Sequence, residues 1–242
     1  GKSFDYGELA ADAALIDAGD VAIKEPAAYE LIGRPTLRVE VPLKVNGSAI
    51  YGMDVRLDGM VYAAIKHCPV IGGTVESYND GSIQDHPGFI QVINLETAVA
   101  VVADHYWQAQ TAVDALEVNW NKGSGAGTST KKWEAEFLAA LDEEGVDASE
   151  TQASLDEIKT ELEASDSNLT ADYFAPYLAH TCMEPLNCTV HVQDDRVDIW
   201  TGTQNPEGAT TIGAETSGIS TDNVYTHNCF LGGGFGRRSN TD

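Results

Sequence analysis

The segment Thr97–Ala103 limits the possible folds more than any other part of the sequence. It reads TAVAVVA and contains no charge, no glycine and no proline. A continuous apolar run of this length, rich in valine, is typical of a strand that is covered on both faces. Shorter segments around it also favour strands, because turn signals such as Asp58-Gly59 and His86-Pro87-Gly88 separate them. We expect these strands over residues 49–57, 60–67, 74–78 and 89–95.

Helical patterns occur on both sides of this strand-rich region. Residues 5–16 predict a short helix, followed by an extended connector that contains Pro26 and Pro35. After the apolar run, residues 106–116 show apolar side chains at helical spacing, and a strand is expected over 117–120. Strands joined by short turns and mixed with one helix indicate an α+β fold of mostly antiparallel character.

The middle of the chain has a different composition. Residues 122–130 read KGSGAGTST, and their glycines fit GxGxG but not the GxGxxG of a dinucleotide loop. A helical pattern follows where a second parallel strand would be required, so a linker is the favoured interpretation. Residues 134–166 hold twelve carboxylates and one lysine, and they predict two amphipathic helices. Their charge indicates a solvated face or, alternatively, a docking surface for a basic partner.

Strand patterns return from residue 168. Alternating side chains over residues 188–193, the turn Asp194-Asp195 and residues 196–200 predict a hairpin. Residues 206–216 predict a helix that begins at Pro206. A last strand over 223–230 leads into a loop with four glycines.

Composition excludes several classes of function. Fourteen basic residues against 38 acidic ones give a formal net charge of −24, which disfavours nucleic acid and anionic membranes as partners. The acidity is consistent with a marine or halophilic source. No apolar stretch reaches the roughly 18 residues of a membrane span. The four cysteines show no CxxC spacing, so no zinc or iron–sulfur site is expected, and they are interpreted as free thiols, with disulfides left open.

The glycine-rich loop is the strongest chemical signal. Residues 230–238 read FLGGGFGRR. Glycine has no Cβ and accepts left-handed torsions, so successive amides can turn toward a bound anion or a metal-oxo group. The paired arginines behind the loop suit planar recognition of phosphate or carboxylate. The loop is therefore a candidate ligand cradle, and a plain tight turn is the alternative.

Several motifs along the chain occur in a fixed order. They are Tyr6–Leu9, Lys44–Val55, Gly59–Ala63, Tyr177–Cys188, Trp200–Pro206 and the glycine-rich loop. With these motifs the chain resembles the molybdenum-binding subunits of the xanthine dehydrogenase and aldehyde oxidase family, in particular the isoquinoline 1-oxidoreductase β subunits. The resemblance covers nearly all of the sequence and is weakest over residues 124–168.

This resemblance implies a domain organisation. It assigns residues 1–38 to an N-terminal helix and connector, and residues 39–122 to an α/β-hammerhead-like domain. Residues 123–167 are then a linker with acidic helices, and residues 168–242 are the incomplete start of a molybdopterin-binding domain.

The resemblance also implies a chemistry. Family members hydroxylate an aldehyde or a carbon of an N-heterocycle, with water as the oxygen source. The cofactor is a molybdopterin carrying molybdenum, expected in its cytosine dinucleotide form. A small [2Fe-2S] subunit and the remainder of the large subunit are the expected partners. The parent protein is expected in the periplasm or cytoplasm of a bacterium.

The family pattern assigns cofactor-binding positions residue by residue. Gln204 matches the glutamine beside a molybdenum oxo ligand, although it alternatively ends a strand and caps a helix. Gly233, Gly234, Phe235, Gly236 and Arg237 match the cofactor loop, with Phe235 alternatively a core aromatic. No residue is expected to ligate the metal.

Three further side chains are candidates for a place in or near the site. Glu184 is a candidate near the site, or alternatively the cap of a turn. His180 is interpreted as a hydrogen-bonded structural residue. His191 is interpreted as an exposed position on the polar side of its strand.

One expected feature is missing from the sequence. The family's catalytic base is a glutamate in a glycine-containing motif near the far C-terminus of the subunit, and nothing here matches it. We therefore expect an internal fragment that is inactive alone and does not retain the cofactor. Two alternatives are a non-catalytic scaffold of the same fold and a nucleotide-binding oxidoreductase that uses Gly123–Gly127.

Overall fold

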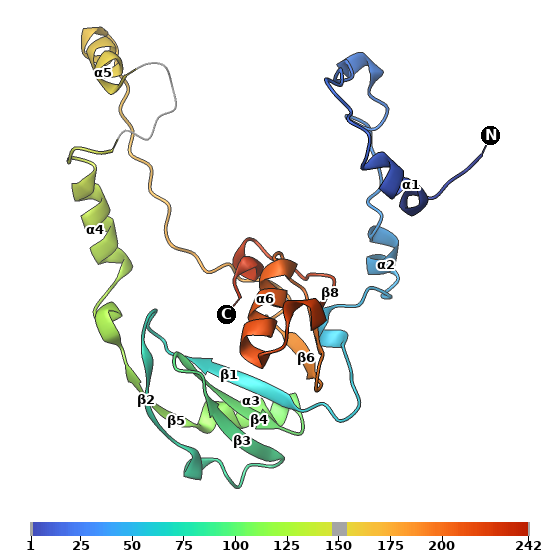
Figure 1. The fold of residues 1–242 in the computed structure, drawn as a ribbon. Coiled ribbons are helices and arrows are strands. Elements are labelled where there is room, and N and C mark those ends of the chain that lie inside the picture. Colours follow the sequence, from blue (N-terminus) through green and yellow to red (C-terminus); the bar gives the residue numbers. More distant parts are fainter. Residues whose placement is uncertain (1, 147–153, 242) are drawn as a thin grey trace. The chain divides into compact units, whose positions relative to one another are not determined.

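The computed structural model in Figure 1 describes residues 2–146 and 154–241. The chain separates into two compact units, Gly1–Ile50 and Tyr51–Asp242. Within the described residues, no helix is both long enough and apolar enough to cross a membrane. The structure is a mixture of helices and strands, which confirms the α+β class.

The first unit contains short helices only, in the part that the structure describes. The helix α1, Tyr6–Ala13, confirms the helix expected over residues 5–16 but ends earlier. Its start is fixed by the Asp5 amide, which donates to Glu8 Oε2 at 2.9 Å. The connector holds one 3₁₀ turn, Pro26–Ala28. The helix α2, Val41–Val45, was not predicted from the sequence.

The second unit begins with the predicted strand-rich domain. A three-stranded antiparallel sheet has the order β1-β4-β3, and β2 pairs antiparallel with β5. The helix α3 packs against β1 and β4. The bounds are β1 Tyr62–His67, β2 Thr74–Asn79, β3 Phe89–Asn94, β4 Ala98–Ala103, α3 Tyr106–Ala115 and β5 Glu117–Asn121, with a 3₁₀ turn Asp80–Ser82.

The apolar run forms the centre of this domain. All six residues of β4 are buried, as the sequence predicts for a strand covered on both faces. Val99 and Val101 pack with Val113 and Leu116, which the helical spacing also places on the inner face. The centre of the core is therefore formed by one strand and one helix that are neighbours in the sequence, and Ala64 of β1 and Ile83 complete it.

The strand predicted over residues 49–57 is wrong. The chain instead makes a 3₁₀ turn, Gly52–Asp54. The physical reason is local: the Tyr51 amide donates to Asp54 Oδ2 at 2.9 Å, and the Asp54 amide donates to the Tyr51 carbonyl. These bonds bend the backbone away from the extended form that a strand needs.

A pair of helices follows the strand-rich domain. The 3₁₀ turn Gly123–Gly125 leads into α4, Thr130–Ala140, which begins at the N-cap Ser129. The helix α5 spans Leu155–Ala164. Part of the acidic segment, residues 147–153, lies outside the described residues. Because β5 pairs antiparallel with β2, the strand before the glycines lacks the parallel neighbour of a dinucleotide fold.

The last part of the chain is a small mixed sheet with one helix. The hairpin of β6, Cys188–Val192, and β7, Val197–Thr201, is confirmed. The helix α6, Pro206–Ser217, connects β7 to β8, Val224–Asn228, which runs parallel to β7. Val197, Ile199, Ala214 and Val224 form the small core between sheet and helix. Two 3₁₀ turns, Thr221–Asn223 and Arg237–Ser239, complete this part.

The expectation of strands from residue 168 onward is wrong for residues 168–187. This stretch is described throughout and contains no helix or strand. Its apolar side chains, among them Leu169, Tyr173 and Leu178, are exposed. A strand is stable only when a neighbouring strand pairs with its backbone, and the described residues supply none here.

Leu116→Ala tests the core of the strand-rich domain. Leu116 is 1% exposed, so its truncation should cost about 2–5 kcal/mol of the free energy of unfolding. Denaturant unfolding of the chain, followed by the fluorescence of Trp120, which packs on this core, measures the loss. Leu141→Ala is the matched control, since Leu141 is 71% exposed and should change stability by less than about 0.5 kcal/mol. Equal effects of the two substitutions would contradict the assignment.

Candidate functional site

The glycine-rich loop leaves the end of β8 and returns at the 3₁₀ turn Arg237–Ser239. Its backbone has positive φ at Gly233 (102°), Phe235 (52°) and Gly236 (87°). Positive φ at a residue other than glycine is uncommon and is held only where the surroundings enforce it. Residues of opposite hand in succession form concave nests of amide N–H groups that bind anions.

The amides at the centre of the loop have no protein acceptor. Within residues 2–146 and 154–241, no hydrogen bond uses the N–H groups of Gly233, Gly234 or Phe235, whereas Gly232 and Gly236 both donate to side chains. Three consecutive free donors in a partly exposed loop fit an anionic ligand. The loop thus has the chemistry that an anionic cofactor requires.

Gln204 lies directly beside this loop. It follows β7 and precedes α6, and its Oε1 accepts from the Gly236 amide at 3.0 Å. A Cβ on Gly234 would lie 2.5 Å from the same Oε1, so only glycine fits there without moving Gln204. Because the oxygen is engaged by an amide donor, the NH₂ group remains available to donate to a ligand. The helix cap is Asn205, whose Oδ1 accepts from Gly208, so Gln204 is not the cap.

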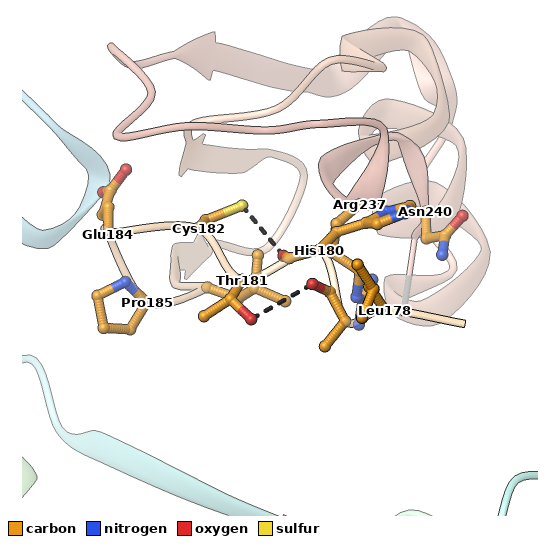
Figure 2. A pocket seen from close by; sticks show the side chains of 10 residues that line it. Leu178, His180, Thr181, Cys182, Glu184, Pro185, Arg237 and Asn240 are labelled. Atoms are coloured by element: carbon orange, nitrogen blue, oxygen red, sulfur yellow. Dashed lines mark hydrogen bonds between the residues drawn. The ribbon is translucent and has the colours of Figure 1, made fainter. Parts of the chain in front are cut away.

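Phe235 and Arg237 of the loop have different surroundings. Phe235 is 70% exposed and is therefore not a core aromatic. Arg237 lines a cavity of about 510 Å³ together with residues of the segment before β6. Figure 2 shows His180, Thr181 and Cys182 along this cavity, with Arg237 and Asn240 at one end.

His180 and His191 are both placed by the structure. His180 lies in an irregular segment and is exposed along the cavity, which does not fit the structural role expected for it. His191 is exposed on β6, as expected. All four cysteines are free thiols. The described residues contain no cluster of three or more histidine, cysteine or acidic side chains that could hold a metal ion.

Glu184 is buried against the loop. Its Oε2 accepts from the Gly232 amide at 2.8 Å and from Arg238 Nη2 at 3.1 Å. Its Oε1 accepts from Asn187 Nδ2 at 3.0 Å. Both carboxylate oxygens therefore have partners inside the protein. A catalytic role for Glu184 remains a prediction, and the geometry gives this carboxylate a structural task.

Arg238 is the residue that sequence reasoning missed. It is 4% exposed, and its guanidinium donates to Gly202 O at 3.0 Å and to Glu184 O at 2.8 Å. The paired arginines indicated phosphate recognition, yet the second arginine points into the protein. Only its place two residues after the last glycine signalled importance, and its partners lie too far away in sequence to be predicted.

A second charged cluster lies on the sheet. Arg196 binds the Asp198 carboxylate through Nε at 2.6 Å and Nη2 at 2.8 Å, and His227 Nε2 lies 2.7 Å from Asp198 Oδ1. The hydrogen bonds from Arg196, with a smaller contribution from His227, hold the pKa of Asp198 far below its ordinary value of 3.8. The His227 ring stacks on Trp200, with ring centroids 4.8 Å apart.

Comparison with known proteins places this geometry in a family. Residues 142–241 match the sequence model of the molybdopterin cofactor-binding domain. The chain is 31% identical to isoquinoline 1-oxidoreductase subunit beta of Brevundimonas diminuta, over 95% of the chain and 30% of that protein. The chain belongs to the family of molybdenum-binding oxidoreductase subunits. The resemblance stated from the motifs is thereby confirmed.

Two further proteins are also similar to the chain. The chain is 25% identical to the xanthine dehydrogenase molybdenum-binding subunit of Escherichia coli O157:H7, over 84% of the chain and 32% of that subunit. Its fold matches quinoline 2-oxidoreductase from Pseudomonas putida 86 with a TM-score of 0.62 and 20% identity, covering 84% of the chain and 31% of that structure. The chain thus spans about a third of the length of the relatives it matches.

Asp198→Asn tests the charged cluster on the sheet. Because the folded-state pKa of Asp198 is depressed, its ionised form stabilises the fold fully above the ordinary value of 3.8, and this stabilisation declines as the pH falls toward the folded-state pKa. The variant should be less stable than wild type at neutral pH, and the difference should shrink between about pH 4 and pH 2. Denaturant midpoints over this range measure it, and a difference independent of pH would contradict the assignment.

Proposed function

We propose that this chain supplies one wall of the molybdenum cofactor site in a larger subunit. The parent protein then hydroxylates an aldehyde or an N-heteroaromatic carbon, with water as the oxygen source, and passes electrons to a small [2Fe-2S] partner. The observation that carries the proposal is the row of three free backbone amides, Gly233 to Phe235, beside the side-chain amide of Gln204. Membership of the molybdenum-binding family supports it.

The proposal also assigns each segment of the chain to a domain. Residues 39–122 are assigned to an α/β-hammerhead domain and residues 168–242 to the first part of the molybdopterin-binding domain, after an N-terminal helix and connector and before the rest of the subunit. The linker and acidic helices of residues 123–167 join the two. The cofactor is assigned the cytosine dinucleotide form, and the compartment is a bacterial periplasm or cytoplasm.

The residues of the loop would act by orientation and charge. When bound, the molybdenum centre on its pyranopterin supplies the redox chemistry and accepts the electrons of the oxidation. The amides of Gly233, Gly234 and Phe235 would donate to its anionic ligand atoms, and the Gln204 NH₂ group would donate to an oxygen. Donors held in place before the reaction stabilise developing charge without reorganising. Gly234 has no side chain to occupy the space of the Gln204 amide.

Molybdenum content is the first test of this function. The full-length subunit, co-produced with its small iron–sulfur partner in a host that makes the cofactor, should hold about one molybdenum per polypeptide by elemental mass spectrometry. Gly234→Ala should lower this content by about tenfold or more, because the new Cβ displaces the Gln204 side chain from Gly236. Gly145→Ala is the matched control, since a Cβ there meets nothing within 4 Å.

A folded full-length subunit without molybdenum would overturn the proposal and favour a non-catalytic scaffold. The isolated chain gives an independent check, because it lacks a match to the family's catalytic glutamate motif. We expect it to bind no molybdenum cofactor and to show no turnover of an aldehyde or N-heterocycle. Turnover by the isolated chain would contradict this part of the proposal.

A further inference from the structure

We propose that the buried ion pair of Glu184 and Arg238 is a positioning device for the cofactor loop, an inference that rests on the proposed function. Neither side chain is assigned to touch the cofactor or the substrate. The pair holds the loop at both ends. The free backbone amides between these ends therefore keep one arrangement relative to the side-chain amide of Gln204.

The first end of the loop is fixed by Glu184 alone. Its carboxylate accepts from the Gly232 amide at 2.8 Å, and its own backbone amide donates to the Gly232 carbonyl at 3.1 Å. Side chain and backbone thus bind both polar groups of one glycine. These two bonds fix the direction of the backbone at Gly232, just before the free amides.

The second end is fixed through Arg238. Its backbone carbonyl accepts from the backbone N–H of Gln204 and from Thr203 Oγ1, both at 3.0 Å. Its guanidinium reaches Gly202 and Glu184 on the other side. One residue therefore links the end of the loop, the strand end that carries Gln204, and the acid that holds the start of the loop.

Stability alone does not explain an ion pair at this place. Burying two charges costs desolvation energy that their attraction often fails to exceed, and apolar replacements are frequently as stable. Here the cost is increased, because Arg238 Nε is buried with no acceptor among the described residues. What the pair does provide is direction: a planar guanidinium presents its donors at fixed angles to three oxygens.

The test compares three variants of the full-length subunit with its small partner. Arg238→Met removes the charge and the donors at similar length, and Glu184→Gln keeps the shape with one oxygen acceptor. Arg196→Met is the matched control, because it removes the partner of another buried carboxylate, Asp198, without touching the loop. Hydrogen–deuterium exchange of peptides covering residues 231–238 reports the loop with or without cofactor, and elemental analysis reports molybdenum.

We expect Arg238→Met to speed exchange of the hydrogen-bonded Gly232 and Gly236 amides within residues 231–238 by about tenfold and to lower molybdenum content by a similar factor. Glu184→Gln should give a smaller change in the same direction, and Arg196→Met should leave both readouts of the loop unchanged. Unchanged loop exchange in Arg238→Met and Glu184→Gln would overturn the proposal. So would faster exchange spread through α6 and β8 in both variants, since the pair would then hold the fold and not the loop.

The exchange readout keeps this inference separate from the proposed function. If the wild-type subunit holds no molybdenum, the proposed function fails. The exchange of the loop amides then still decides whether the ion pair positions them.

Discussion

The contact between Arg238 and Glu184 is the interaction on which the rest of the candidate site depends. It joins three segments that are distant in sequence: the irregular chain before β6, the end of β7 and the residues after the glycines. Gln204 is also joined to the loop directly, through the Gly236 amide and the Arg238 carbonyl. The sheet and α6 supply a rigid base, and the buried pair transfers that rigidity to a segment with no regular structure of its own.

The glycine-rich loop, residues 230–238, carries none of the strong negative charge of the chain. The loop itself carries the arginines, and its centre presents amide hydrogens. An anionic ligand would be repelled by a wall of carboxylates, and the carboxylate that contacts the loop, Glu184, is matched by a buried cation. The acidic surface and the donor-rich loop therefore serve different physical ends, solubility and recognition.

The sequence allowed prediction wherever local signals decide the structure. The helix α6 was placed nearly to the residue because Pro206 marks its start, and β4 because its apolar run is continuous. The strand over residues 49–57 failed because the bonds between Tyr51 and Asp54 override the propensity. Motif order found Gln204 and the loop. The ion pair escaped prediction because its members lie 54 residues apart and only the tertiary structure brings them together.

The topology of the last sheet has a consequence for the order of folding. The hairpin of β6 and β7 closes over a two-residue turn, whereas β8 can join β7 only after α6 has crossed between them. Local closure is fast and distant pairing is slow, because more chain entropy must be lost first. During synthesis the hairpin therefore precedes the helix and the parallel strand, and the glycine loop closes last. The candidate site is thus completed after the sheet and helix that carry it.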